Sequence, residues 1–335
     1  MRIDITGLLD GFAGFDPLAL GIAPGTCLIV DFTGPIGQRL ANLPPAAEQW
    51  LASLPCPSIA LTESIAGVGG FDMSLNEESH VQRIEAAVAA NPTASTILVQ
   101  TLRLVERLPL LEGLTVESLA FAALQQADEF HAWLKSFRER ESSAPAGDSG
   151  PPVVVTRSDD VLSILLNRPA TRNAVDVVMR DALFEAYSLA VHDHDLRRVD
   201  VRGAGDSFCT GGALGDFGRI GSGAAGHMVR TERLPARMLA RAGEKFHFHL
   251  HGACIGAGIE MAAFGGRVTA SPDAFMRLPE VGMGLIPGAG GTVSITRRIG
   301  RQAAAWIMLT GQRISARTAL RLGLVDEIVR EPAAA

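Results

Sequence analysis

Along the second half of the chain, short apolar runs alternate with longer stretches in which apolar residues recur three and four positions apart. Apolar runs of six or seven residues are typical of buried strands, whereas the wider spacing is typical of helices that bury one face. A helix is predicted over residues 176–192, where Val178, Leu183 and Leu189 follow helical spacing. This alternation implies an α/β fold in which helices cover a sheet. The expected strands span residues 161–167, 197–203, 247–252 and 266–271.

The first 140 residues show two strand-like runs followed by a mainly helical pattern. The runs lie at residues 27–32 and 58–61, and this part carries no chemical motif when taken alone. Helical spacing begins at Val81 and stops at Asn91–Pro92, because proline ends one helix and favours the start of another. Further helical stretches are predicted over residues 93–107 and 114–140.

One seam divides the chain. Residues 139–152 are rich in Ser, Gly, Pro and Ala and show no apolar periodicity, which is typical of a flexible linker. We therefore predict three parts: a mainly helical segment over residues 1–140, a linker over 141–152 and an α/β core over 153–335.

Composition narrows the classes of protein that remain. Apolar residues make up 47% and charged residues 20%, as in globular proteins. The formal net charge of −6 argues against a general nucleic-acid binder. Lys135 and Lys245 are the only lysines, so a bound phosphate would rest mainly on arginines or backbone N–H groups. Because no run of about 18 apolar residues and no signal-peptide pattern occurs, we expect a cytoplasmic protein without a membrane partner.

Cysteine and histidine positions do not favour a metal site. The four cysteines lack metal-ligand spacing and have apolar neighbours, so we expect them to be buried and reduced. Alternation places three histidines of the strand at 247–252 on one face. A metal could bind there, but histidines packed in the fold, or one near a ligand, are the favoured interpretation. The residues concerned are Cys27, Cys56, Cys209 and Cys254, and His247, His249 and His251.

Three glycine-rich stretches lie where a predicted strand meets a helix, at residues 207–218, 251–261 and 278–292. Glycine lets a backbone N–H approach a ligand closely. In the second stretch Gly256 and Gly258 open a helix, so unpaired N–H groups and the positive end of the helix dipole suit an anionic oxygen. A dinucleotide-binding pattern is excluded because the third glycine is missing, and no phosphate-binding P-loop motif occurs.

Two carboxylates stand beside these glycines. Glu260 follows the second turn on an apolar helix start, where a lone glutamate would more often be a partner of the helix dipole. Glu280 lies between Pro279 and Val281 in an apolar stretch and is difficult to explain as a solvated surface residue. Two carboxylates in apolar surroundings favour a functional pair.

The order of these motifs resembles the crotonase, or enoyl-CoA hydratase/isomerase, superfamily. The resemblance spans about residues 153–330 and implies a crotonase-like ββα superhelix core. It rests on several ordered blocks, which makes it far more specific than any single glycine pattern. The blocks are LNRPATRNA (166–174), FCTGG (208–212), GAGIE (256–260), LPEVGMGLIPGAGGT (278–292), LTG (309–311) and GLVDEIV (323–329).

The resemblance implies the addition of water to an α,β-unsaturated acyl-CoA thioester through a stabilised enolate. Backbone N–H groups of Gly212 and Ala257 would form the oxyanion hole. Glu260 and Glu280 would be the catalytic pair, since two acids in one apolar pocket can hold different protonation states. Coenzyme A would be part of the substrate, so no separate cofactor and no metal are expected. The residues implied in substrate or coenzyme A binding are Arg172, Asn173, Ala174, Gly211, Gly256 and Gly288.

Departures from the family pattern leave other functions open. Ala213 stands where the family usually has Asp, Gly215–Asp216 replaces a common basic residue, and Ala257 stands where Gly is commoner. An enoyl-CoA isomerase, which moves a proton with one carboxylate, or another crotonase-type enzyme such as a thioester hydrolase would use the same parts. A cofactor-independent oxygenase is less favoured because it does not need the glutamate pair. A non-catalytic acyl-CoA-binding protein is the alternative of a different class.

The first part of the chain resembles a segment that the family carries elsewhere. Family members continue past the 323–329 block into a helical tail that covers the acyl pocket and builds a trimer, whereas this chain stops at Ala335. By this analogy we expect a trimer or a dimer of trimers. We also expect a degenerate or permuted first unit whose helices cap the site, the alternative being an independent helical domain that binds a partner. The segments that resemble the tail are 86–104, 113–118 and 130–140, and residues 54–61 resemble the strand before the second oxyanion loop.

Overall fold

The computed structural model describes residues 1–11, 17, 21–35, 37, 43–63, 68–140 and 150–329. Residues 141–149 of the predicted linker and the last residues of the predicted core, 330–335, lie outside the described residues. The described chain is a mixed α/β fold, as the alternating pattern predicted. No helix in these ranges is long and apolar enough to cross a membrane.

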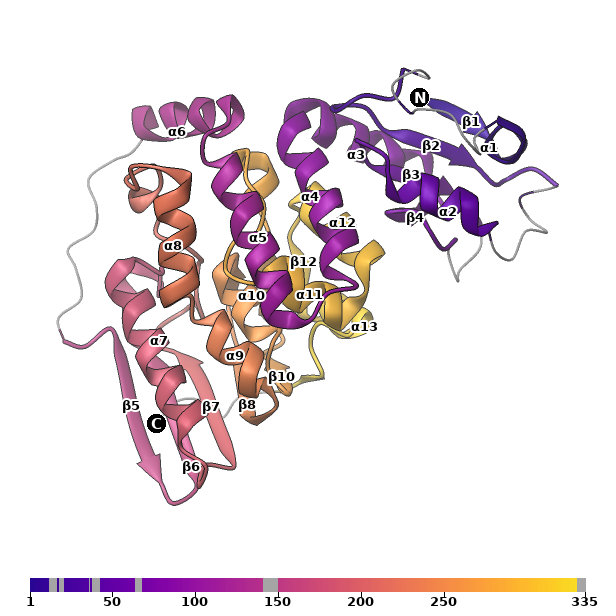
Figure 1. The fold of residues 1–335 in the computed structure, drawn as a ribbon. Coiled ribbons are helices and arrows are strands. Elements are labelled where there is room, and N and C mark those ends of the chain that lie inside the picture. Colours follow the sequence, from indigo (N-terminus) through magenta and orange to yellow (C-terminus); the bar gives the residue numbers. More distant parts are fainter. Residues whose placement is uncertain are drawn as a thin grey trace.

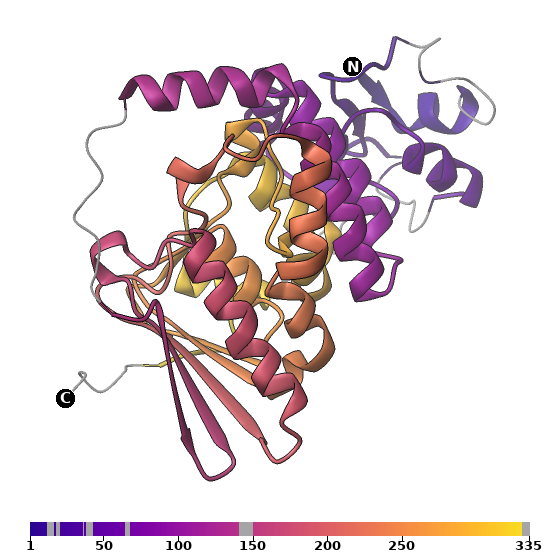
Figure 2. The ribbon, with the colours of Figure 1, turned by 60° about the vertical axis from the view of Figure 1, so that its left-hand side comes forward.

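A six-stranded sheet forms the base of the second half of the chain (Figures 1 and 2). Its strand order is β13-β10-β8-β7-β6-β5, with only the β5–β6 hairpin antiparallel. The four strands predicted from the sequence are all present, and β5 is an additional hairpin partner. The strands are β5 (Val153–Ser158), β6 (Val161–Leu166), β7 (Arg198–Gly203), β8 (Phe246–Leu250), β10 (Arg267–Ala270) and β13 (Glu327–Ile328).

Helices and a small second sheet complete this half. The crossovers between parallel strands carry α7 (Val177–His192), α8 (Gly223–Arg233), α9 (Ala236–Ala242) and α10 (Ala257–Ala262). A three-stranded sheet of order β12-β11-β9 joins the glycine-rich loops. Its strands are β9 (Ala253–Ile255), β11 (Phe275–Arg277) and β12 (Ile314–Ser315). The last helical elements are η6 (Glu280–Met283), α11 (Gly291–Ile299), α12 (Arg301–Thr310) and α13 (Ala316–Leu322).

The chain begins with a parallel sheet whose strands follow chain order, β1-β2-β3-β4. Only β2 and β3 were predicted, because β1 and β4 have three residues each and carry too few apolar positions to show a pattern. One face of the sheet packs on α1 and α2, and the opposite face joins the main core. The elements are β1 (Arg2–Asp4), α1 (Ile5–Gly11), β2 (Leu28–Asp31), α2 (Pro45–Ala52), β3 (Ser58–Leu61) and β4 (Met73–Leu75).

Four helices connect this sheet to the second half: α3 (Glu78–Ala90), α4 (Pro92–Val105), α5 (Leu110–Leu124) and α6 (Asp128–Arg140). The single helical stretch expected over residues 114–140 is wrong, since it consists of α5 and α6 with a turn between them. The turn lets the two helices pack in different places. Helix α5 contacts α4, α8 and α11, whereas α6 contacts η6, and Figure 2 shows α6 lying across one end of the molecule.

The two halves share one apolar core. Leu98 and Leu102 of α4 and Leu114 of α5 are buried in the same cluster as Val293 of α11 and Met308 of α12. The helices of the first half are therefore part of the core of the second. Burying each such side chain contributes about 1.5–3 kcal/mol to stability. The predicted linker therefore does not separate two independently packed cores.

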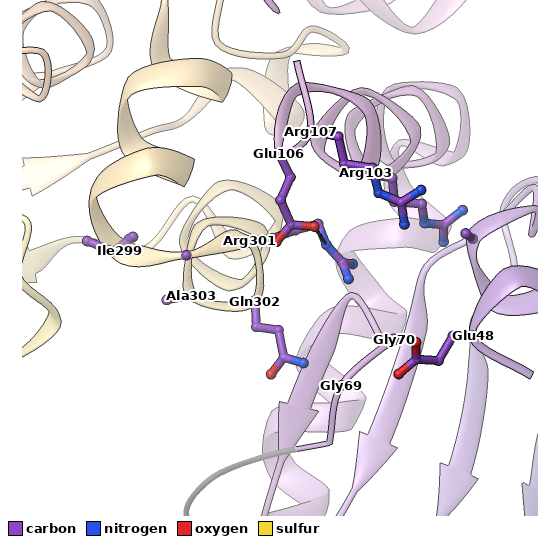
Figure 3. A pocket seen from close by; sticks show the side chains of 12 residues that line it. Glu48, Gly69, Gly70, Arg103, Glu106, Arg107, Ile299, Arg301, Gln302 and Ala303 are labelled. Atoms are coloured by element: carbon purple, nitrogen blue, oxygen red, sulfur yellow. Dashed lines mark hydrogen bonds and ion pairs between the residues drawn. The ribbon is translucent and has the colours of Figure 1, made fainter. Parts of the chain in front are cut away.

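A buried ion network also joins the halves, and Figure 3 shows two of its members, Arg103 and Arg301. Asp72, which precedes β4, accepts hydrogen bonds from Arg103 of α4 at 2.9 Å and 2.5 Å and from Arg301 of α12 at 2.8 Å. Arg103 also donates to the carbonyls of Leu54 and Cys56 at 2.6 Å and 2.8 Å. Charges so far from water require this many partners to offset their lost hydration.

Replacing Asp72 by Ala is expected to destabilise the protein by about 3–5 kcal/mol, because it leaves the buried Arg103 without its carboxylate and removes one of the two carboxylate partners of the largely buried Arg301. Urea denaturation followed by circular dichroism measures the loss. The matched control is Glu78→Ala, which breaks an exposed ion pair with Arg2 and should cost below about 1 kcal/mol. Equal losses for both variants would contradict the role of the buried network.

Candidate active site

A cavity of about 490 Å³ lies where α5 faces the glycine-rich loops. Mixed apolar and ionisable walls of this kind are typical of small-molecule sites. The cavity shown in Figure 3, of about 500 Å³, lies at the ion network between the halves instead, and its Arg103 and Arg301 are paired with protein groups. Residues of the first cavity include Phe121, Gln125, Val175, Arg180, Gly212, Ala213, Phe217, Arg230, Leu234, Ala257, Glu260, Met261, Glu280, Gly288 and Ala289.

Two glycines allow the first and second glycine-rich loops to touch. The backbones of Cys209 and of Cys254 in β9 form an isolated parallel β-bridge. This β-bridge holds the loop at 207–212 against the start of α10. A side chain on Gly211 would lie 2.9 Å from the carbonyl oxygen of Ile255, and its φ of +88° is unfavourable for other residues. Gly256 has a φ of +49°, and a Cβ there would lie 2.7 Å from Oε1 of Glu280. Both positions therefore require glycine.

The predicted oxyanion residues follow directly after these glycines and line the same cavity. Gly212 comes after Gly211, and Ala257 is the first residue of α10 after Gly256. The first N–H groups of a helix have no intrahelical acceptor, so the N–H of Ala257 is available to another partner. Gly212 and Ala257 therefore line the same cavity as Glu260 and Glu280.

The two predicted carboxylates converge from different elements. Glu260 of α10 and Glu280 of η6 are 2% and 9% exposed. Oε1 of both faces Gly256, at 3.8 Å and 2.7 Å from the Cβ position of that residue. Their other oxygens differ: Oε2 of Glu260 accepts hydrogen bonds from the N–H groups of Ala289 and Gly291 at 2.7 Å and 2.9 Å, whereas Oε2 of Glu280 is buried without a partner.

A third buried carboxylate, Glu117 of α5, was missed by the sequence reasoning. Its oxygens accept hydrogen bonds from the N–H of Gly290 at 2.7 Å, the N–H of Thr292 at 2.9 Å and the hydroxyl of Thr292 at 2.7 Å. The four consecutive N–H groups at 289–292 therefore donate alternately, those of 289 and 291 to Glu260 and those of 290 and 292 to Glu117. The available signal was a glutamate in the middle of a mostly apolar helical stretch, GLTVESLAF.

Burial perturbs the protonation of all three carboxylates. It raises the pKa of Glu280 to about 8 and that of Glu117 to about 7. Burial, together with the charges of Glu280 and Glu117, also raises the pKa of Glu260 well above its usual value, while the N–H groups at 289 and 291 oppose this. Since hydrogen-bond donors favour the charged form, negative charge is best held on Glu260 and Glu117 and the proton on Glu280.

The residues expected in coenzyme A binding differ in their burial and in their contacts. Asn173 is fully buried, and its amide donates to the carbonyls of Ala204, Ser207 and Phe208, so it holds the loop together and its side chain does not line a channel. Arg172 is exposed and Ala174 half-buried beside it. Gly288 lines the cavity, where a Cβ would collide with the ring of Phe121 at 2.3 Å.

The histidine strand and the cysteines make internal contacts. Nε2 of His249 lies 2.9 Å from Oδ1 of Asp200, and Nε2 of His251 lies 2.9 Å from the carbonyl oxygen of Gly205. All four cysteines are free thiols and buried, as predicted. In the part of the chain that the structure describes, no group of three or more His, Cys, Asp or Glu side chains is arranged to hold a metal ion.

Replacing Glu117 by Gln is expected to reduce stability by about 1–3 kcal/mol, because the new NH₂ group faces a backbone donor that loses its acceptor. Activity should fall with it, since the donors to Glu260 belong to the same four residues. Urea titration and kcat measure the two effects. Glu112→Gln, an exposed position on the same helix, is the control and should change stability by less than about 0.5 kcal/mol. Unchanged stability of the Glu117 variant would contradict this role.

The second half of the chain is similar to several known proteins. The family model described as enoyl-CoA hydratase/isomerase matches residues 156–334, more than half of the chain. A 2,3-dehydroadipyl-CoA hydratase of Escherichia coli (strain K12) is 31% identical over 176 residues, which cover 52% of this chain and 68% of that protein. The crystal structure of an enoyl-CoA hydratase/isomerase from Mycobacterium paratuberculosis has a TM-score of 0.50 and 27% identity, covering 54% of this chain and 74% of that one. The chain belongs to the enoyl-CoA hydratase/isomerase family.

Proposed function

We propose that this protein is a hydratase that adds water to the α,β-double bond of an acyl-CoA thioester. The observation that carries the proposal is the contrast between two converging carboxylates: Glu260 accepts two backbone hydrogen bonds, whereas Oε2 of Glu280 has no partner. Hydration needs one group that accepts a proton from water and another that donates one. The similarity to a protein named as a hydratase supports this choice. Coenzyme A is part of the substrate in this proposal, so no further cofactor is needed.

The thioester carbonyl would lie between the N–H groups of Gly212 and Ala257. When the water oxygen bonds to the β-carbon, the electron pair of the double bond moves toward the thioester, and its carbonyl oxygen gains negative charge. Two fixed donors stabilise that enolate, and removing one such donor typically costs about 3–4 kcal/mol of barrier. The glycines at 211 and 256 hold the two loops in contact, which keeps these donors near each other.

The carboxylates would divide the proton transfers. Ionised Glu260 takes a proton from the attacking water, and protonated Glu280 gives its proton to the α-carbon, so the product gains one complete water molecule. Glu260 is then protonated and Glu280 ionised, and a proton passes between them or through solvent before the next cycle. The raised pKa of Glu280, about 8, keeps this group protonated at neutral pH.

The test is turnover of trans-2-enoyl-CoA by the purified full-length chain. Loss of the conjugated enoyl absorbance, with a product heavier by one water, is expected over part of a panel of straight-chain, branched and aromatic substrates. Conversion of 3-enoyl-CoA to 2-enoyl-CoA without a water adduct would instead identify an isomerase, which needs only the proton transfer of one carboxylate. Binding of acyl-CoA without turnover of either substrate would identify a non-catalytic binding protein.

A further inference from the structure

Arg230 of α8 is an unusual component of the cavity wall. Its guanidinium carbon lies 4.0 Å from the centre of the Phe121 ring, and Nη2 donates to the side chain of Gln125 at 3.4 Å. Nη1 is buried and has no hydrogen-bond partner. A Cβ on Gly226, one turn earlier, would lie 3.2 Å from Nη1, so glycine makes room for the guanidinium. A buried cationic donor without an acceptor is costly unless a ligand supplies one.

The other two arginines of the cavity have carboxylate partners. Arg180 donates to Asp181 at 2.7 Å and 2.9 Å, and Arg219 lies 3.7 Å from Asp216. Among the described residues Arg230 has no carboxylate within ion-pair distance, because the oxygens of the neighbouring Glu117 are used by Gly290 and Thr292. Burial lowers the pKa of Arg230 to about 10, so the group remains cationic at neutral pH.

The surroundings of Arg230 suit an acyl chain. Phe121, Val229, Leu234 and Met261 line the same cavity with apolar surface. A cation set into apolar walls favours a ligand with an apolar stem and an anionic end. Arg230 lines the same cavity of about 490 Å³ as Glu260 and Glu280, so the stem between the thioester and the anionic end must be short.

We propose that the cavity takes a short acyl chain that ends in a carboxylate, and that Arg230 binds this group and thereby determines substrate specificity. Gln125 and the ring of Phe121 hold the planar guanidinium in place, leaving Nη1 for the ligand. Guanidinium is the protein group best matched to a carboxylate in geometry and charge. The identity of the substrate class rests on the proposed acyl-CoA function of the same site.

The test compares two six-carbon substrates, trans-2-hexenoyl-CoA and trans-2-hexenedioyl-CoA, which differ only at the far end. The full-length chain is expected to have a kcat/KM at least tenfold higher for the diacid. Arg230→Met should lower kcat/KM for the diacid roughly 10- to 150-fold, as for loss of a hydrogen bond between charged groups, and change that for hexenoyl-CoA by less than about threefold. Arg230→Lys should restore part of the preference.

The control is Arg233→Met on the same helix. Arg233 is 46% exposed and ion-paired with Glu185, so both rates should stay within about twofold of the wild type. Thermal unfolding of each variant checks that it is folded. A similar loss for both substrates in folded Arg230→Met, or a wild type that prefers hexenoyl-CoA, would overturn the proposal.

Calorimetric binding of adipyl-CoA, hexanoyl-CoA and free coenzyme A separates this proposal from the proposed reaction. Tighter, Arg230-dependent binding of adipyl-CoA supports a carboxylate site even if neither enoyl thioester is hydrated, in which case only the hydratase proposal fails. Equal wild-type affinities for the two acyl-CoAs overturn the carboxylate site. If Arg230→Met weakens the binding of free coenzyme A as much as that of adipyl-CoA, the carboxylate site is also overturned, because the arginine would then bind the phosphates of the coenzyme.

Discussion

Replacing Glu260 or Glu280 by Gln is expected to lower kcat for hydration by about 10²- to 10⁴-fold, the usual contribution of a positioned acid or base. Glutamine keeps the size of each side chain but can neither accept a proton from water nor donate one to carbon. Affinity for a saturated acyl-CoA should change little, because the N–H groups of Gly212 and Ala257 remain. Steady-state kinetics and calorimetry measure the two quantities. Full rates in both variants would exclude the proposed mechanism.

The control for this pair is Glu232→Gln, an exposed carboxylate on α8, which should retain wild-type kcat. The pH profile gives a second check. Activity should fall as the pH rises through about 8, because Glu280 then loses the proton that it donates. Activity should also fall as the pH is lowered, because Glu260 then becomes protonated. Since the pKa of Glu260 is raised, this loss should begin at a pH above the range that is usual for glutamate. In Glu280→Gln the alkaline limb is expected to disappear.

A chain that begins at Gly150 is expected to be insoluble or unable to bind acyl-CoA. It would lack the helices whose side chains fill the shared core, including Leu114, Phe121 and Leu124 of α5. At about 1.5–3 kcal/mol each, these three side chains alone contribute roughly 5–9 kcal/mol, which is comparable with the whole stability of a typical protein. The truncated chain would also lose Glu117, so the N–H groups of Gly290 and Thr292 would lose their acceptor.

Expression, sedimentation and circular dichroism test this prediction. The control is the full chain cut once by a protease between Arg140 and Gly150, which keeps both halves of the shared core present and should leave the two pieces associated and active. Full solubility and acyl-CoA binding of the truncated chain would mean that the second half is an independent unit, and would contradict the capping role of α5. Co-expression of residues 1–140 with the truncated chain should restore both properties.

Several features of this protein were determined by local sequence. The strands β6, β7, β8 and β10 were recognisable from local sequence. β6 is a mainly apolar run, whereas in β7 and β8 apolar residues alternate with polar ones, as strand geometry requires when only alternate side chains are buried. The loop positions of Gly211 and Gly256 were predicted from glycine clusters. Glycine is required there because the two loops approach so closely that a side chain would not fit. Glu260 and Glu280 were recognisable because a carboxylate in an apolar run needs a specific reason to be there.

Only the tertiary structure decided how the first half takes part. Glu117 and its hydrogen-bond donors at Gly290 and Thr292 are 173 and 175 residues apart, so no local pattern connects them. The unpaired Nη1 of Arg230 is visible only once Phe121 of α5 and Gln125, which follows α5, are placed beside it. Asn173 was assigned to a channel because its motif stands near the site, yet its amide is used by three carbonyls of its own loop region. Hydrogen-bond satisfaction and burial depend on everything that surrounds a group, whereas periodicity depends only on its neighbours in the chain.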